Sequence, residues 1–307
     1  MPAIPATEPP FPPDPSTTGY IDTDDGVRLW WQSHGPTDAT DEAPLVCSNG
    51  VGVSVFFWQY LVKGFKHSRR VLLWDYRGHG RSAEVDDNHE MTIERCAEDL
   101  KLLLDSLGIQ QAVLVGHSMG VQVSLEFYRR YRERVAGFIA VLGTAGAPLK
   151  TFMGMSNGQP IFDVITDLAT RSGPRTEGLF RSFLRWPRMD GVARAIWQVH
   201  PRLAPAGDLR RYLHHMSGMS LKTFARMVVA LGEHSAWDLL PEVRVPTLII
   251  GGQLDAFSPV DLSNKMNSLL PDSELLMLPD ATHAGLIEQP DTINLAVRRF
   301  LRRRIDT

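Results

Sequence analysis

Most of the chain alternates short apolar runs with longer segments in which apolar residues recur at helical spacing. The apolar runs are continuous, as is typical of strands that are covered on both faces. They lie at residues 45–48, 71–74, 112–115, 138–142, 247–250 and 275–278. Between two of them, residues 93–107 place their apolar side chains on one helical face, with Thr92 as the expected N-cap. This βαβ rhythm predicts a mostly parallel sheet.

Three regions depart from this rhythm. Residues 1–18 are dense in proline and poor in large apolar residues, which predicts an extended N-terminal arm. Residues 19–35 are typical of two strands around an Asp-Asp-Gly turn, so the sheet should hold about eight strands. Residues 146–240 have no strand-like run but two segments with helical spacing, which predicts a helical cap inserted into the sheet. The expected organisation is an α/β core flanked by helices at 19–145 and 241–307, an arm at 1–18 and a cap at 146–240.

Composition alone excludes no class of protein, whereas charge, apolar runs and cysteine spacing narrow the expectations. Hydrophobic residues make up 43% and charged residues 22% of the 307 residues, which is ordinary for a globular protein. The formal net charge of -3 implies no general attraction to nucleic acid. No apolar run approaches the roughly 20 residues that span a bilayer, and no secretory signal is visible, so we expect a cytoplasmic location. Cys47 and Cys96 lack metal-ligand spacing, so we expect neither a disulfide nor a metal site.

The segment GHSMG, residues 116–120, fits the nucleophile pattern G-x-S-x-G. In this pattern a sharp turn between a strand and a helix exposes the serine hydroxyl, and glycines are needed because a Cβ would collide with neighbouring backbone. An apolar run ends at Val115 and a helical pattern begins near Val121, which is the context that the pattern requires. Ser118 is therefore the candidate nucleophile.

A serine hydroxyl is a weak nucleophile at neutral pH, so it needs a base and a carboxylate that orients the base. On a parallel sheet these groups should follow the C-terminal ends of later strands. Asp255 and His283 stand at such positions. Asp280 is a weaker candidate because it lies close in sequence to the histidine turn. Asp238 is weaker too, because we expect it in the first turn of a short helix.

With serine, aspartate and histidine in this order, the sequence resembles the α/β-hydrolase superfamily, in the serine-nucleophile branch with a helical cap that includes esterases and lipases. The resemblance extends from about residue 19 to residue 303. The segment DYRGHGRS, residues 75–82, is similar to the loop after the fourth strand in many cap-bearing members. This likeness implies that Asp75 and His79 have structural roles.

Acyl transfer in this superfamily also needs two backbone N–H groups that bind the oxyanion of the transition state. The first should belong to Met119, directly after the nucleophile. The second should belong to Val51, in the loop after the first apolar run. Many members begin this loop with His-Gly, whereas this chain has Asn49-Gly50. The amide donor is unaffected, but the hydrogen bonds that hold the loop must differ.

The expected cap is rich in large, adaptable apolar side chains, which suit an apolar acyl or alcohol group. The candidates for contact with substrate are Phe152, Met153, Phe183, Trp186, Met216 and Met219. The sequence thus predicts a serine hydrolase that cleaves a small to medium apolar carboxylic ester through an acyl-enzyme, without a cofactor. The expected partner is a small-molecule ester, and a homodimer is left open.

Other functions use the same arrangement. Hydrolysis of carbon–carbon bonds, lactones and thioesters, and perhydrolysis, employ the same triad on the same fold. A ligand receptor on a hydrolase scaffold is an alternative of a different class. A serine nucleophile argues against the dehalogenase and epoxide-hydrolase branches, whose nucleophile is an aspartate. The sequence leaves the choice of bond open.

Overall fold

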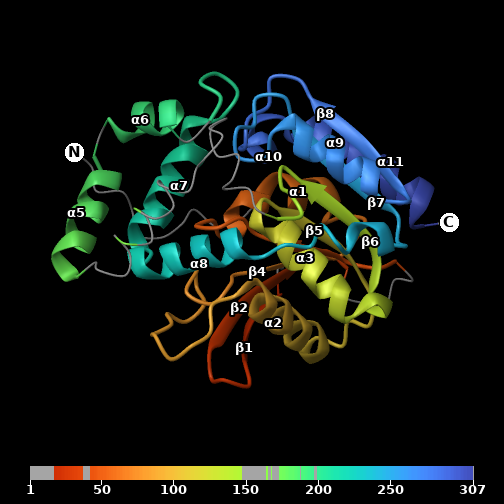
Figure 1. Ribbon diagram of the computed structural model, residues 1–307, viewed down its shortest axis with the longest axis horizontal. Helices are drawn as coiled ribbons and strands as arrows, with labels where there is room; N and C mark the ends of the chain where they lie inside the picture. Colours follow the sequence, from red (N-terminus) through yellow and green to blue (C-terminus); the bar gives the residue numbers. More distant parts are fainter. Residues whose placement is uncertain are drawn as a thin grey trace.

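A single mixed sheet forms the centre of the computed structural model (Figure 1), which describes residues 17–36, 42–146, 164, 167, 173–186, 188–196 and 199–306. Its eight strands lie in the order β1-β2-β4-β3-β5-β6-β7-β8. They are β1 (Thr17–Asp22), β2 (Arg28–His34), β3 (Leu45–Ser48), β4 (Val71–Trp74), β5 (Ala112–His117), β6 (Val135–Val141), β7 (Thr247–Gly252) and β8 (Ser273–Leu278). Strand β2 runs antiparallel to β1 and β4, and the other neighbouring pairs are parallel. The predicted mostly parallel sheet of about eight strands is confirmed.

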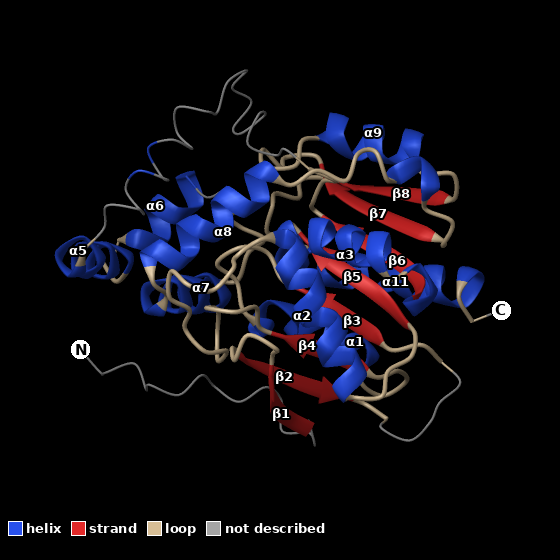
Figure 2. Cartoon of the chain, turned by 60° about the horizontal axis from the view of Figure 1, so that its bottom comes forward, coloured by secondary structure: helices blue, strands red, loops and turns tan. Residues whose placement is uncertain are grey.

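Helices cover both faces of the sheet (Figure 2). Helices α1 (Gln59–Phe65) and α11 (Pro290–Arg304) pack on one face, and α2 (Ile93–Ser106), α3 (Met119–Arg130) and α9 (Val260–Leu269) pack on the other. Strands β3, β4 and β5 are buried at every residue, which explains why their sequences are continuously apolar. The C-terminal ends of the parallel strands meet at one edge, where Ser48 pairs with Gly116 and Gly116 with Ala140.

Between β6 and β7 the described residues include a group of helices that lies to one side of the sheet (Figure 1). These inserted helices are α5 (Pro174–Leu184), α6 (Met189–Ile196), α7 (Ala206–Gly218) and α8 (Leu221–Glu233). The chain leaves and re-enters the core at one point, where Gly146 and Ser235 form an isolated β-bridge. The amide of Ala236 donates to the carbonyl oxygen of Ala145 there, at 2.7 Å. The two ends of the insertion are thus held together.

Several elements differ from their predicted extents. Strand β1 begins at Thr17, inside the expected arm, because Thr17 and Thr18 pair with residues of β2. Strand β6 begins at Val135, earlier than the apolar run that predicted it. Asp238 lies in a turn rather than in a helix, and it pairs with Arg129 at 2.8 Å. Helices α6 (8 residues) and α7 (13 residues) were not predicted individually.

Two further predictions concern the cysteines and membrane-spanning helices. Cys47 in β3 and Cys96 in α2 are both buried and free, as expected. In the part of the chain that the structure describes, no helix has the length and the apolar character needed to cross a membrane.

A buried ion pair ties the segment 75–82 to helix α2. Arg77 donates from Nε to Oδ2 of Asp99 at 2.7 Å and from Nη2 to Oδ1 at 2.8 Å. Both side chains are 0% exposed. Asp25 accepts a further hydrogen bond from Arg77 at 2.8 Å, and so does the carbonyl oxygen of Glu90 at 3.0 Å. The guanidinium is therefore compensated on several sides, as a buried charge must be.

Replacing Asp99 with alanine should lower the free energy of unfolding by about 3–5 kcal/mol, because it leaves the buried charge of Arg77 without its main partner. Urea unfolding at neutral pH measures the loss. The matched control is Asp105→Ala on the same helix, whose carboxylate is 38% exposed and pairs with Lys101 and Arg134 at the surface. The control should change stability by less than about 1 kcal/mol. Equal losses in the two variants would contradict this account.

Candidate active site

Ser118 lies in a sharp turn between β5 and α3. Its backbone has φ 54° and ψ -117°, a conformation that residues with a side chain rarely adopt. Hydrogen bonds hold it there: its amide donates to the carbonyl oxygen of Val141 at 3.1 Å, and its carbonyl oxygen accepts from the amide of Val121 at 3.1 Å. The turn is the strained strand-to-helix junction that the sequence pattern predicts.

Glycines let this turn pack directly on neighbouring backbone. A Cβ on Gly116 would lie 2.4 Å from the carbonyl oxygen of Gly120, and a Cβ on Gly120 would lie 2.1 Å from that of Ser48. Both distances are far below any van der Waals contact. The start of α3 therefore sits against the end of β3, and Ser118 lies beside the loop that follows β3.

Ser118, His283 and Asp255 form one hydrogen-bonded series. The Nε2 atom of His283 is 2.8 Å from Oγ of Ser118, and its Nδ1 atom is 2.9 Å from Oδ2 of Asp255. The side chain of Asp255 is fully buried, whereas that of His283 is 19% exposed. A carboxylate that accepts from Nδ1–H leaves the Nε2 lone pair directed at the serine hydroxyl. This arrangement can remove the hydroxyl proton as the oxygen attacks.

Asp255 also shapes its own turn. Its Oδ1 atom accepts hydrogen bonds from the amides of Phe257 at 2.8 Å and Ser258 at 2.9 Å. The turn and the contact to His283 thus use different oxygens of one carboxylate. Asp280 and Asp238, the weaker candidates, do not contact His283: Asp280 lies in the turn after β8 with φ 56°, and Asp238 pairs with Arg129.

Two backbone amides lie close to Ser118. Met119 follows it at the first position of α3, where the helix dipole favours negative charge. Val51 lies in the loop after β3, and a Cβ on the preceding Gly50 would be 3.1 Å from Cβ of Ser118. Within the described residues, neither the amide of Met119 nor that of Val51 has a hydrogen-bond acceptor. Both predicted donors are thus available to an oxyanion.

Asn49 holds the loop in which Val51 lies. Its Nδ2 atom donates to the carbonyl oxygen of Trp74 at 2.9 Å, and its Oδ1 atom accepts from the indole Nε1 of Trp58 at 2.6 Å. Its own carbonyl oxygen accepts from the hydroxyl of Tyr76 at 3.0 Å. The asparagine that replaces histidine in this chain therefore ties the loop to β4 and to the segment before α1.

His79 supports the same loop from the other side. Its Nε2 atom accepts a hydrogen bond from the amide of Gly52 at 3.3 Å, and its Nδ1 lies 3.1 Å from the carbonyl oxygen of Arg77, to which it donates. Burial lowers the pKa of His79 to about 4, so the ring is neutral at pH 7. Asp75 accepts from the amides of Val55 at 3.2 Å and Arg81 at 3.1 Å. Both residues make the structural contacts expected from the resemblance.

His117 is a neighbour of the site that sequence reasoning missed. Its Nε2 atom lies 3.1 Å from the carbonyl oxygen of His283, to which it donates, and the two rings are 5.2 Å apart. The ring of Phe257 also lies near that of His283, with the ring centroids 4.8 Å apart. Burial, followed by the charge of His283, lowers the pKa of His117 to about 3. The motif G-x-S-x-G leaves this position unspecified, so only its place next to the serine could have indicated it.

Met216 and Met219, two of the residues predicted to contact substrate, are both buried, and Met216 lies near the loop that follows β3. The Sδ atom of Met216 is 2.5 Å from the position that a Cβ on Gly52 would occupy, so α7 lies against the loop that carries Val51. Met219 is buried as well. Two further candidates fall outside the described residues: Phe152 and Met153.

The remaining two candidates lie at the surface, which gives no support for a role in substrate binding. Phe183 is 51% exposed and Trp186 is 46% exposed. Helix α5 packs on α7, with Leu184 buried and Phe180 partly buried. Phe183 projects roughly 100° away from Leu184 around the helix, so it faces outward. The composition of the segment could not indicate which helical face would be covered.

Among the described residues, one cluster holds three possible metal ligands, Glu94, Glu126 and His234, with ligand atoms within 4.8 Å of one another. Glu126 already accepts hydrogen bonds from Arg129 at 3.1 Å and Arg130 at 2.8 Å. Two guanidinium groups on one carboxylate oppose the binding of a cation. Glu126 thus belongs to an ion-pair network, and the absence of a metal stays a prediction.

Comparison with known proteins identifies the family. Residues 43–290 match the family described as alpha/beta hydrolase fold, and the chain belongs to this family of hydrolases. The chain is 28% identical over 288 residues to the bifunctional esterase/perhydrolase of Acinetobacter calcoaceticus, covering 92% of this chain and 99% of that relative. It is 29% identical over 284 residues to the dihydrolipoyllysine-residue acetyltransferase component of the acetoin cleaving system of Pseudomonas putida. This match covers 91% of this chain and 68% of that relative. A thermophilic esterase from Thermogutta terrifontis has the same fold, with a TM-score of 0.73 at 24% identity over 93% of this chain and 98% of that one.

The stability of the protein should depend on pH through His79. Its pKa of about 4 lies below the ordinary value of 6.5. Between pH 4 and pH 6.5, the unfolded chain therefore binds a proton at this histidine that the folded chain does not bind. Stability should therefore fall as pH drops from 6.5 to 4, by up to about 1.4 kcal/mol per pH unit. His79→Gln keeps an acceptor for the amide of Gly52 without a titrating group, so this variant should lose less stability as the pH drops.

Urea unfolding of the wild type and of His79→Gln at several pH values between 4 and 7 measures this difference. The exposed His67 offers a matched control, because His67→Gln removes a histidine that does not support the loop. Parallel pH profiles for the wild type and His79→Gln would show that His79 does not contribute as described.

Proposed function

We propose that this hydrolase cleaves small to medium apolar carboxylic esters through an acyl-enzyme on Ser118. One observation carries the proposal: His283 bridges Oγ of Ser118 at 2.8 Å and Oδ2 of Asp255 at 2.9 Å, on a turn with a strained serine. An ester substrate is supported by two similar proteins, an esterase/perhydrolase of similar sequence and an esterase of similar fold.

In the first half of the reaction, Oγ of Ser118 attacks the ester carbonyl carbon while Nε2 of His283 takes the hydroxyl proton. The carbonyl oxygen becomes an oxyanion, which the amides of Val51 and Met119 stabilise. Asp255 stabilises the imidazolium that forms. The carbon–oxygen bond to the alcohol then breaks, and His283 returns its proton to the leaving alkoxide.

In the second half, water replaces the alcohol. His283 takes a proton from the water as its oxygen attacks the acyl carbon, and the same two amides hold the second oxyanion. The bond to Oγ of Ser118 breaks, and the proton on His283 returns to the serine. Ester and water are thus converted to acid and alcohol, and the site regains its starting state.

The preference for an apolar substrate is proposed from the surroundings of the loop at 49–52. The thioether of Met216 and the ring of Phe224 both lie within 3.0 Å of the position that a Cβ on Gly52 would occupy. The ring of Phe57 lies 5.0 Å from that of His117, next to the nucleophile. Thioether and aromatic groups adapt to apolar ligands of irregular shape. We further propose that the inserted helices act as a cap over this region.

Ser118→Ala should abolish hydrolysis of p-nitrophenyl esters from acetate to dodecanoate, because the variant lacks the Oγ atom that carries the acyl group. The native protein should turn over, with an optimum of chain length, and should be labelled on Ser118 by a fluorophosphonate. Ser124→Ala is the matched control, because Ser124 is a buried serine of the same helix α3. It should retain both activity and labelling.

The outcomes separate the alternatives. Labelling of Ser118 without hydrolysis of any ester would support Ser118 as the nucleophile but would favour a lactone, a thioester or a carbon–carbon bond as the bond that is cleaved. Slow hydrolysis with a single turnover and retained product would favour a receptor. Equal activity in the native protein and Ser118→Ala would contradict the proposed mechanism.

Asn49→Ala should lower kcat about tenfold to 100-fold with a smaller change in KM, because it loosens the loop whose Val51 amide binds the oxyanion. Steady-state kinetics on the best p-nitrophenyl ester measures the effect. Asn88→Ala is the control, since Asn88 is exposed and bonds only within its own turn to Asp86. If both variants keep the native kcat, Asn49 does not position the oxyanion donor.

A further inference from the structure

Glu288 lies at the end of the short helix α10 (Gly285–Glu288), five residues after His283. Its Oε2 atom accepts from the amide of Thr282 at 2.8 Å, and its Oε1 atom accepts from the hydroxyl of Thr282 at 2.7 Å. The same hydroxyl accepts from the amide of Ala284 at 3.3 Å. The residues on both sides of His283 are therefore held, directly or through one hydroxyl, by this carboxylate.

The carboxylate is buried, and no cationic side chain pairs with it among the described residues. Glu288 is 6% exposed, and no arginine, lysine or histidine forms an ion pair with it in the described ranges. A buried carboxylate is costly unless hydrogen bonds satisfy its oxygens. Here the donors come from Thr282 and from the inserted helices, where the backbone amide of His200 donates to Oε1 at 2.7 Å.

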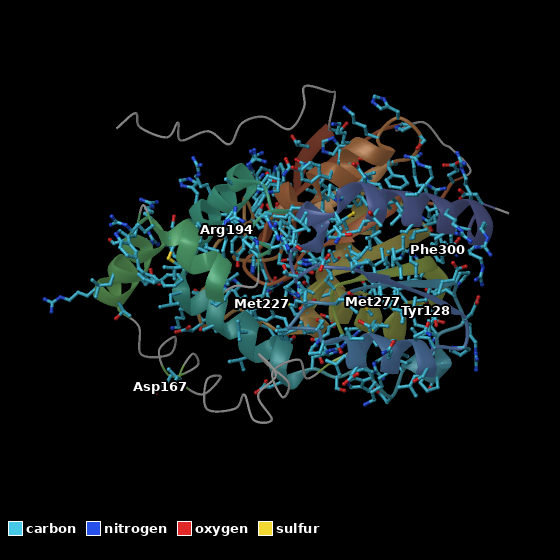
Figure 3. The ribbon with its side chains drawn as sticks, turned by 90° about the horizontal axis from the view of Figure 1, so that it is seen from above. Tyr128, Asp167, Arg194, Met227, Met277 and Phe300 are labelled. Atoms are coloured by element: carbon cyan, nitrogen blue, oxygen red, sulfur yellow. The ribbon has the colours of Figure 1, made fainter. Side chains whose placement is uncertain are left out.

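The segment around His200 is rigidly held within the insertion. Arg194 of α6 donates to the carbonyl oxygens of His200 at 2.9 Å, Pro201 at 3.0 Å and Ala204 at 3.1 Å. Figure 3 places Arg194 among the inserted helices, away from the core residues Phe300 and Met277. An unbroken series of hydrogen bonds thus runs from Arg194 through the segment 200–204 to Glu288 and the residues that flank His283.

We propose that Glu288 is a positioning residue that couples the inserted helices to His283 through its hydrogen bonds from His200 and Thr282. When the helices are seated, three donors satisfy the carboxylate and fix the backbone on which His283 lies. When the segment 200–204 moves away, one donor is lost, and the hold on Thr282 weakens. The base is then correctly placed only while the insertion is in position. The kinetic consequence rests on the proposed ester hydrolysis.

Arg194→Gln tests the coupling from a distance, because it loosens the segment 200–204 without touching Glu288 or His283. Hydrogen–deuterium exchange should rise in peptides covering 199–204 and also in those covering 279–284. In a Glu288→Gln background, Arg194→Gln should raise exchange only in 199–204, because the link to the loop of His283 has been cut. This readout does not depend on any activity, so it separates the coupling from the proposed function.

Steady-state kinetics gives the second readout. Glu288→Gln should lower kcat about tenfold to 100-fold with little change in KM, because it displaces the base rather than the substrate. Arg194→Gln should lower kcat about fivefold in the native background and have no further effect in the Glu288→Gln background. Glu126→Gln is the matched control, a buried glutamate on α3 whose loss should leave kcat unchanged.

Two results would overturn the proposal. Additive effects of Arg194→Gln and Glu288→Gln on kcat would show that the two residues act independently. Unchanged exchange in 279–284 after Arg194→Gln, with increased exchange in 199–204, would show that the insertion does not reach His283. Thermal unfolding of each variant identifies any loss of kcat that comes from unfolding. If Glu288→Gln is unstable, the exchange test can still be made with Arg194→Gln alone, because Arg194 is partly exposed.

Discussion

The contact between the backbone of α3 and the end of β3 is the constraint on which the site depends. It exists only because Gly120 has no Cβ, since any side chain there would overlap the carbonyl oxygen of Ser48. The contact sets Ser118 beside the loop after β3 and forces its positive φ. Such strain costs about 1–3 kcal/mol and persists only where the surroundings determine the conformation. Here the parallel strands on either side supply that rigidity, so the sheet itself holds the reacting atom.

Around this contact, buried polar side chains act mainly by holding backbone. Asn49, His79, Asp255 and Glu288 each bond to amides or carbonyl groups of loops that would otherwise have no regular partners. A buried polar group is costly unless it is satisfied, so each of these loops has one favoured position. Asp255 and Glu288 flank His283 in this way, one from the ring side and one from the backbone side. The imidazole is thereby placed by two carboxylates with different tasks.

The sequence predicted the features that leave a local signal. Strands buried on both faces appear as continuous apolar runs, and the nucleophile turn has a glycine pattern, so the sheet, Ser118 and the positions of Asp255 and His283 could be anticipated. Contacts set by tertiary structure could not. The partner of Asn49 is an indole nine residues away, and that of Glu288 is an amide of the insertion 88 residues away. The outward face of α5 was missed because an apolar composition does not indicate which residues a neighbouring helix covers.

The joined ends of the insertion have a consequence for how this protein can change over evolution. The chain enters and leaves the helical segment at the bridge between Gly146 and Ser235, so the backbone connects the insertion to the core at two adjacent points. The entropic cost of closing a loop grows slowly with its length. Helices can therefore be added, removed or exchanged between these two points while the sheet and the nucleophile turn stay as they are. Selection can therefore alter the inserted helices as long as a backbone amide near residue 200 still donates to Glu288.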